Sequence, residues 1–168
     1  MDSDIILLNG PSSSGKSTLA KELADRLNRK GIIRWETVSI DSFLAMSKDE
    51  TIYEDDVFEI SDLMIDAILE HLKCGKRVIV DHVITSRRIY ERFMDRLAAH
   101  RICLVHVSCP LHIIRQREML RGDRCIGSAE ASFQYLYPQD GYNSAVDTFR
   151  MTLEECCNAI LHTDGRSC

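Results

Sequence analysis

The chain has 168 residues, of which 45% are hydrophobic and 28% are charged, as in an ordinary soluble globular protein. This length suits one domain, residues 1–168, with room for a small lid. The net charge of −5 and the isoelectric point near 5.7 argue against a nucleic-acid-binding surface, which usually carries a basic excess.

The seven cysteines are odd in number and form no C-x-x-C pair, so we expect reduced thiols instead of disulfides or a zinc site. The sequence has no apolar run of membrane-spanning length and no basic-then-apolar leader. We therefore expect a cytoplasmic protein without a membrane contact. The sequence gives no signal for an oligomeric state.

The first half of the chain alternates short apolar runs with longer helical patterns. Residues 5–8 form a wholly apolar run that predicts a buried strand, and a helix is predicted over residues 16–30. Residues 38–40 are predicted to end a second strand, directly before Asp41. The next helix, over about 55–73, counts Leu63, Ala67 and Leu72 among its apolar positions.

The second half continues the alternation. In chain order it contains predicted strands at residues 77–80 and 102–107, with a helix over 85 to about 99 between them, a helix that opens at Pro110, and a lid with a short helix. A fifth strand ends near residues 146–148, and the capping box Thr152-Leu-Glu-Glu155 opens a last helix to about residue 162. The alternation predicts an α/β fold with a parallel sheet that helices cover on both faces.

A phosphate-binding loop is predicted between the first strand and the first helix, where the sequence matches G-x-x-x-x-G-K-[ST]. The glycines allow backbone N–H groups to surround phosphate oxygens, while Lys16 can reach the β- and γ-phosphates and Ser17 can bind Mg²⁺. The alternative, a glycine-serine turn, fits the flanking strand and helix less well. The predicted nucleotide-binding residues are Gly10, Pro11, Ser12, Ser13, Ser14, Gly15, Lys16, Ser17 and Thr18.

Two aspartates follow apolar strands, at the edge of the sheet where α/β proteins bind ligands. Asp81 resembles a Walker-B aspartate and is a candidate Mg²⁺ ligand, whereas Asp41 is a candidate for the base that accepts a hydroxyl proton. Their roles can also be exchanged. The alternative for each residue is that it only caps a helix.

Arg115, Arg117, Arg121 and Arg124 form a local basic cluster after the fourth strand. Arg117, Arg121 and Arg124 share one helical face by their spacing, so they can fold over a triphosphate and stabilise its charge during transfer. We expect a lid over about residues 117–135. The alternative is a solvated charged face with Glu118 and Asp123 as ion-pair partners.

Two histidines are weaker candidates. His106 lies in an apolar strand, which favours a hydrogen-bonded core residue. His82 follows Asp81 at a strand end, where it can touch an acceptor, but no second histidine has the spacing of a metal site.

With these motifs placed, the chain resembles the chloramphenicol phosphotransferase family of P-loop kinases nearly from end to end. The Asp-Ser after the second strand, joined to the R-E-x-x-R-G-D-R run, is the most specific part. The resemblance is carried by Ile6-Leu-Leu-Asn-Gly10, Ser12-Ser-Ser-Gly-Lys-Ser17, Asp41-Ser42, Met46, Val78-Ile-Val-Asp81-His-Val83, Arg117-Glu118, Arg121-Gly-Asp-Arg124, Gln134, Tyr142 and Val146-Asp-Thr148.

The resemblance implies a P-loop kinase fold, a five-stranded sheet of order 2-3-1-4-5, and transfer of phosphate from ATP to the primary hydroxyl of chloramphenicol. It also implies that Asp41 is the base. The chain departs from the family at His82, where the family has a second acid, and in the segment between Met46 and Ile65, which is shorter here.

The sequence therefore predicts a small-molecule kinase that uses ATP and Mg²⁺, with Lys16, Asp41, Arg117, Arg121 and Arg124 as catalytic residues and Ser17 and Asp81 as metal ligands. Its partners are ATP and a small hydroxyl-bearing substrate, with no nucleic acid. Two alternatives stay open. The acceptor can be another metabolite, a sugar or a nucleoside, or the protein can be a nucleotide-binding regulator.

Overall fold

A five-stranded parallel sheet organises the chain, and its strands lie in the order β2-β3-β1-β4-β5. The computed structural model describes residues 2–44, 54–121 and 127–164. The sheet confirms both the α/β class and the strand order that the family resemblance implied. Its strands are β1 (Ile5–Asn9), β2 (Trp35–Ser39), β3 (Arg77–His82), β4 (Ile102–Ser108) and β5 (Ser144–Asp147).

The central strand β1 is buried along its whole length. Its first residue, Ile5, pairs with Val78 of β3 and Ile102 of β4. Successive side chains alternate between the two faces of the sheet, so Ile5 and Leu7 join one hydrophobic core whereas Ile6 and Leu8 join the other. This is why the strand is apolar without interruption.

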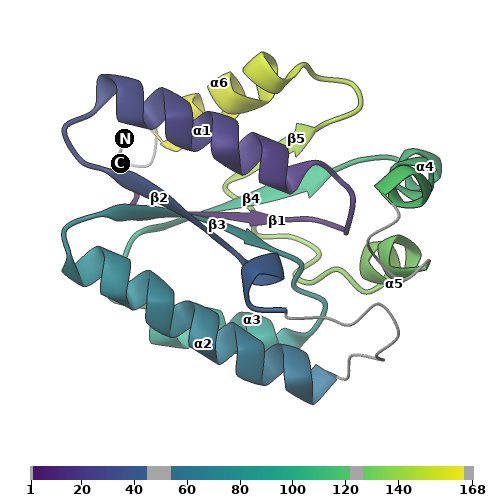
Figure 1. Ribbon diagram of the computed structural model, residues 1–168, viewed down its shortest axis with the longest axis horizontal. Coiled ribbons are helices and arrows are strands. Elements are labelled where there is room, and N and C mark those ends of the chain that lie inside the picture. The colour runs from purple at the N-terminus through teal and green to yellow at the C-terminus, as the bar shows by residue number, and fades with distance from the viewer. Residues whose placement is uncertain (1, 45–53, 122–126, 165–168) are drawn as a thin grey trace.

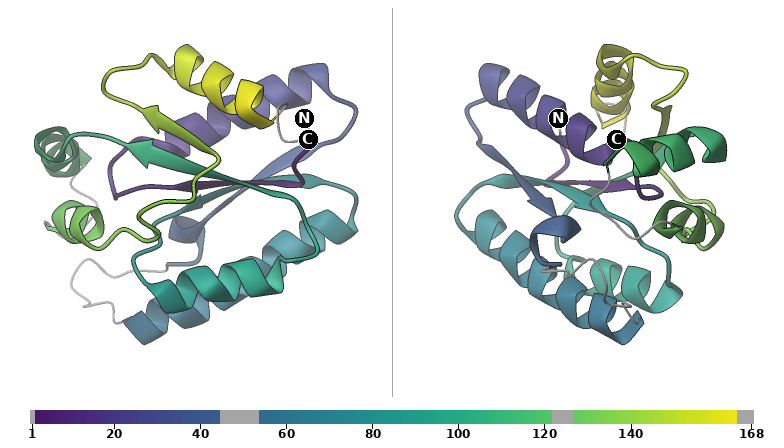
Figure 2. Two further views of the ribbon diagram at one scale, coloured as in Figure 1. Left: turned by 180° about the vertical axis from the view of Figure 1, so that it is seen from behind. Right: turned by 45° about the vertical axis from the view of Figure 1, so that its right-hand side comes forward.

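Helices cover both faces of the sheet (Figure 1). On one face lie α1 (Lys16–Lys30) and α6 (Leu153–Asp164), and on the other lie α2 (Glu54–Lys73) and α3 (Arg87–Arg96). The short 3-10 helix η1 (Ile40–Ser42) follows β2. Figure 2 shows α4 (Leu111–Arg121) and α5 (Ser128–Gln134) together beyond the carboxyl ends of the strands.

Several local predictions were inaccurate at their edges. Strand β2 ends at Ser39, one residue before the predicted end, because Ile40 begins the 3-10 helix η1. Helix α3 begins at Arg87 instead of residue 85, since Ser86 before it has an extended backbone. Leu63 is 60% exposed, because the buried face of α2 is formed by Ser61, Met64, Ile65 and Ile68.

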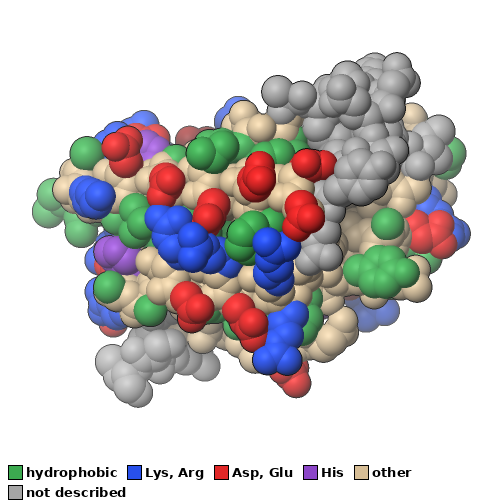
Figure 3. Space-filling view, turned by 90° about the horizontal axis from the view of Figure 1, so that it is seen from below, with side chains coloured by type: hydrophobic (Ala, Val, Ile, Leu, Met, Phe, Trp, Pro, Cys, Tyr) green, Lys and Arg blue, Asp and Glu red, His purple; other side chains and the backbone are tan. Residues whose placement is uncertain are grey.

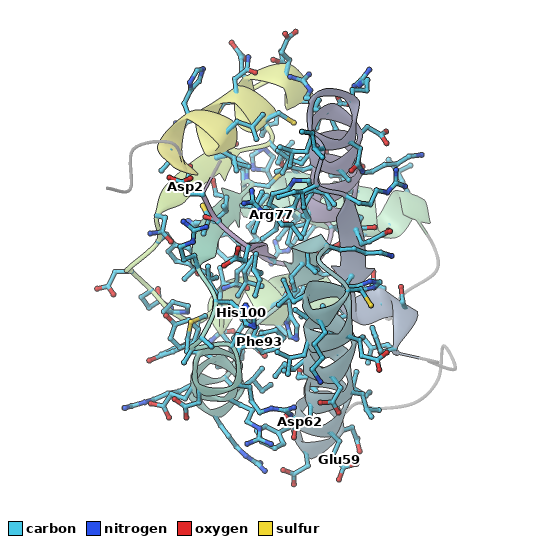
Figure 4. The ribbon with its side chains drawn as sticks, turned by 90° about the vertical axis from the view of Figure 1, so that its left-hand side faces the viewer. Asp2, Glu59, Asp62, Arg77, Phe93 and His100 are labelled. Carbon is cyan, nitrogen blue, oxygen red and sulfur yellow. The ribbon has the colours of Figure 1, made fainter. Side chains whose placement is uncertain are left out.

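The outer surface of α2 and α3 carries interleaved acidic and basic side chains (Figure 3). Asp62 faces α3 (Figure 4), where it accepts hydrogen bonds of 2.8 and 2.9 Å from Arg92 and one of 3.2 Å from Arg96. The Arg92 guanidinium holds the pKa of the Asp62 carboxyl below its usual range. Phe93, fully buried, packs the same helix onto the sheet. This face is therefore tied together by its own ion pairs.

The capping box at the start of α6 is confirmed. The Thr152 amide donates to the Glu155 carboxylate at 2.8 Å, and the Glu155 amide donates to the Thr152 hydroxyl at 3.2 Å. Of the helices in the described ranges, none combines the length and the apolar character needed to cross a bilayer.

Candidate active site

The loop between β1 and α1 is shaped by two glycines. A Cβ atom at Gly10 would lie 2.2 Å from the carbonyl oxygen of Val107, because the loop passes directly over β4. Gly15 has a φ of +92°, in the left-handed region that favours glycine. A larger residue at Gly10 would therefore push the loop away from β4, and one at Gly15 would strain the backbone.

The loop fits an anion. Ser13 has a φ of +62° and Gly15 follows with a second left-handed conformation, an arrangement that turns backbone N–H groups to one side. Within the described residues, the buried hydroxyls of Ser13 and Ser14 have no hydrogen-bond partner. Helix α1 starts next to them without an acidic residue in its first turn, so its positive end is left for a phosphate group.

Lys16, Ser17 and Asp81 meet beside this loop. The Lys16 ammonium donates to the Pro11 carbonyl at 2.9 Å and lies 4.0 Å from a carboxylate oxygen of Asp81. The Ser17 hydroxyl donates to the other carboxylate oxygen at 2.6 Å. Asp81 lies inside β3, five residues before the helix cap at Ser86, so the interpretation of Asp81 as a helix cap is wrong.

A pocket of about 630 Å³ opens over these groups. Asp41 contributes to it from η1, and Arg117 contributes from α4, so side chains that are far apart in the sequence face one cavity. Apolar side chains also line the pocket: Ile40, Val83, Leu120, Met151, Leu153 and Cys156.

The arginines of the predicted cluster have different places. Arg117 lines the pocket and donates to the hydroxyl of Thr148 at 3.3 Å, whereas Arg115 pairs with Glu130 on the exposed surface. The side chain of Arg121 and all of Arg124 lie outside the described residues. Helix α4 thus presents at least one of the expected arginines to the phosphate loop, and a second points elsewhere.

Glu118 is buried, whereas the solvated-face interpretation predicts an exposed side chain. It is 4% exposed, and its carboxylate accepts hydrogen bonds from the amides of Gly127 at 3.0 Å and Ala129 at 2.7 Å. Asp123, the other expected partner, lies outside the described residues, as does Met46. Glu118 therefore joins α4 to the start of α5.

Two hydroxyl groups at the loop were not among the predicted site residues. The Thr148 hydroxyl donates to the carbonyl of Ser14 at 2.6 Å, and the Ser132 hydroxyl accepts from the amide of Ser12 at 2.9 Å. The signal for Thr148 was its place at the end of the fifth strand. Ser132, on the short helix α5, had no comparable signal.

His82 lies in the core instead of at the pocket. Its ring is fully buried, with Nε2 3.1 Å from the Ser61 hydroxyl and an edge-on contact with Phe93 at 5.0 Å between centroids. Burial lowers the pKa of His82 to about 4. His106 is half-buried against the ring of Tyr142, and burial lowers its pKa also.

The buried His82 predicts a loss of stability in acid. Below its ordinary pKa of 6.5, the unfolded chain gains a proton at His82 that the folded chain excludes until about pH 4. The stability present above pH 6.5 should therefore fall by on the order of 3 kcal/mol as the pH approaches 4. His82→Gln keeps a polar partner for Ser61 and does not titrate. Its free energy of unfolding, measured by urea titration, should depend less on pH over this interval, and equal dependence in both proteins would contradict the prediction.

The sheet order and the loop place this chain in the P-loop kinase fold. APS kinase CysC from Mycobacterium tuberculosis, in a structure with AMPPNP and APS, has a TM-score of 0.78 at 17% identity, over 98% of each chain. A gluconokinase from Sinorhizobium meliloti 1021 has a TM-score of 0.71 at 19% identity, over 96% of this chain and 91% of that one. The tunicamycin resistance protein of Deinococcus radiodurans has a TM-score of 0.68 at 21% identity, over 97% and 96%.

Within this fold class, residues 3–164 match the family described as chloramphenicol phosphotransferase-like protein, and the chain belongs to that family. The match confirms the resemblance seen in the sequence motifs. No match was found among the curated proteins. Family membership, with the fold of the solved kinases, supports a phosphotransferase that acts on a small molecule.

Proposed function

We propose that this protein is an ATP-dependent phosphotransferase, active as a single kinase domain in the cytoplasm, that adds the γ-phosphate to a hydroxyl of a small molecule. The observation that carries the proposal is the meeting of Lys16, Ser17, Asp81, Asp41 and Arg117 at one pocket. A nucleotide-dependent switch needs the first three. The second carboxylate and the arginine are what phosphoryl transfer adds.

In this proposal the loop of residues 10–18 holds the phosphates of ATP. The unpartnered hydroxyls of Ser13 and Ser14 and the start of α1 supply donors, and Lys16 supplies a charge close to the β- and γ-phosphates. Lys16 is 5% exposed, so its charge acts where little water screens it. The groups are in place before a ligand arrives, which limits the cost of ordering them.

Ser17 and Asp81 fit a magnesium ion. Both offer oxygen, and Mg²⁺ is usually held by one or two protein ligands together with substrate phosphates. The residues that the structure describes contain no group of three or more His, Cys, Asp and Glu side chains suited to a metal. When bound, the ion would offset the negative charge of the phosphates.

Asp41 is the candidate base of the transfer. Asp81 accepts a hydrogen bond from Ser17 and lies near Lys16, and Asp41 is an exposed carboxylate that lines the same pocket. The acceptor oxygen forms its bond to the γ-phosphorus as the bond to the leaving oxygen of ADP breaks, and the hydroxyl proton passes to the Asp41 carboxylate. Arg117 stabilises the charge on the phosphoryl group.

Measurement of ATP consumption with a panel of hydroxyl compounds tests the proposal. Chloramphenicol is the first acceptor to try because of the family, followed by gluconate, other sugars and nucleosides. Phosphate recovered on chloramphenicol would support a role in antibiotic resistance, and phosphate on another compound would define a metabolite kinase. Tight ATP binding with no transfer to any hydroxyl would favour the regulatory alternative and overturn the kinase.

Arg117→Ala is expected to lower kcat by about 10²-fold or more, because it removes a cation beside the phosphates. The melting temperature should change little, since the hydrogen-bond partner of the guanidinium within the described residues is Thr148, through its hydroxyl and its carbonyl. Arg115→Ala is the matched control, because it removes the same group from the exposed surface of the same helix. Equal kcat values in the two variants would contradict a role for Arg117 in transfer.

A further inference from the structure

Thr148 contacts the phosphate loop from the far end of the chain. Its hydroxyl donates to the Ser14 carbonyl at 2.6 Å, across 134 residues of sequence. Its Cβ and Cγ2 atoms also lie 3.7 Å from the position that a Cβ would take at Gly15. The residue therefore fixes a carbonyl in the middle of the loop and packs against the turn that begins α1.

The same hydroxyl is joined to the arginine of the pocket. Arg117 donates to the Thr148 hydroxyl oxygen at 3.3 Å and to the Thr148 carbonyl at 3.4 Å. A hydroxyl has one proton to donate and two lone pairs to accept, so both contacts are made at once. The guanidinium charge polarises the hydroxyl and strengthens its bond to Ser14.

Hydrogen bonds also fix the backbone on both sides of Thr148. The Thr148 amide donates to the Ser108 carbonyl at 3.1 Å, which continues the pairing of β5 with β4. Beyond it, the Asp147 carboxylate accepts from the amides of Phe149 at 2.9 Å and Arg150 at 3.2 Å. Thr148 thus stands on a tight turn at the end of the sheet, which limits how far its hydroxyl can move.

We propose that Thr148 is a positioning residue that couples the phosphate loop to Arg117, so that the loop and the cation take up one geometry together. The inference rests on the proposed function in that Arg117 acts on the bound phosphates. It goes further because it states that Thr148, which lies outside both the loop and α4, sets the position of the Arg117 side chain.

Thr148→Val and Thr148→Ser separate the hydroxyl from the shape of the side chain. Valine keeps the branched shape but loses the hydroxyl and with it the bonds to Ser14 and from Arg117, so ADP affinity, measured by calorimetry, should fall about tenfold. Serine keeps the hydroxyl, and its affinity should stay within about threefold of the unmodified protein. Equal losses in the two variants, at matched melting temperatures, would show that packing and not the hydroxyl matters, and would overturn the proposal.

A double-mutant cycle with Arg117→Ala tests the coupling itself. If Thr148 acts partly through Arg117, Thr148→Val should weaken ADP binding about tenfold in the unmodified protein and about threefold or less in the Arg117→Ala background. Ser132→Ala is the control, because the Ser132 hydroxyl bonds to the loop amide of Ser12 and to the carbonyl of Ala129 and not to Arg117 within the described residues. Its effect should be the same in both backgrounds. An identical factor for Thr148→Val in both backgrounds would overturn the coupling.

ADP binding needs no acceptor, so these measurements stand apart from the test of the kinase. A protein that binds ADP with the expected coupling but phosphorylates no hydroxyl compound would overturn the proposed function and support the role of Thr148. A protein that phosphorylates an acceptor but shows no coupling between Thr148 and Arg117 would support the proposed function and overturn the role of Thr148. Failure of the unmodified protein to bind ADP would overturn both.

Discussion

Lys16→Met is expected to reduce phosphoryl transfer by at least about 10²-fold. Methionine keeps much of the length of the lysine stem and removes the ammonium, which lies 2.9 Å from the Pro11 carbonyl and 4.0 Å from Asp81 at the floor of the pocket. In the proposed mechanism this charge offsets that of the β- and γ-phosphates during transfer. The rate of ADP release in a coupled assay measures the loss.

The same variant should still fold. The Lys16 ammonium lies outside both hydrophobic cores, and Asp81 keeps the hydrogen bond from Ser17 at 2.6 Å. Lys21→Met is the matched control, because Lys21 is exposed on the same helix and does not line the pocket. Near-normal turnover in folded Lys16→Met would refute the assignment of the phosphate loop as the site of chemistry.

Asp41→Asn should lower turnover by about 10²–10⁴-fold, the range typical of general-base catalysis. Asparagine keeps the shape of the side chain and cannot accept the acceptor proton in the same way. Much of the effect can come from loss of the carboxylate that orients the hydroxyl, because the transition state of phosphoryl transfer is loose. Since Asp41 is exposed on η1, the melting temperature should stay close to that of the unmodified protein.

Measuring both kcat and the affinity for Mg-ATP distinguishes the roles of Asp41 and Asp81. Asp41→Asn should leave Mg-ATP affinity nearly unchanged. Asp81→Asn should weaken it, because Asp81 accepts the hydrogen bond of the Ser17 hydroxyl and is proposed to hold Mg²⁺ together with Ser17. Asp25→Asn, an exposed position on α1, controls for the change in net charge. A strong loss of Mg-ATP affinity in Asp41→Asn would place Asp41 at the metal and transfer the case for the base to Asp81.

Much of the fold was readable from local pattern. The apolar run at residues 5–8 and the Leu19, Leu23 and Leu27 repeat are properties of adjacent turns and strands, so they predicted β1 and α1 with only one residue of error. The strand order was a different matter. Alternation predicts that a sheet is parallel, but any strand can pair with any other, and the order came from the family resemblance.

The phosphate loop was determined by the sequence, because its function depends on residues that are contiguous and on glycines that the backbone geometry requires. The sequence did not predict the directions of three side chains on α4, those of Arg115, Arg117 and Glu118. They lie close together on one helix, yet one lines the pocket, one binds the amides of α5 and one faces solvent. Their directions depend on how α4 packs against α5 and on the contact of Arg117 with Thr148, which no local pattern contains.

Only the tertiary structure showed the burial of His82 and the place of Thr148. His82 is the last residue of β3 and Thr148 directly follows β5, and the sequence pattern of a strand end is the same whether the side chain there turns to a pocket or to a core. His82 turns toward Ser61 of α2, and Thr148 turns toward Ser14, 134 residues earlier. Contacts of this span are set by the packing of elements that the chain brings together only when it folds, so the sequence determined the loop and the structure decided what surrounds it.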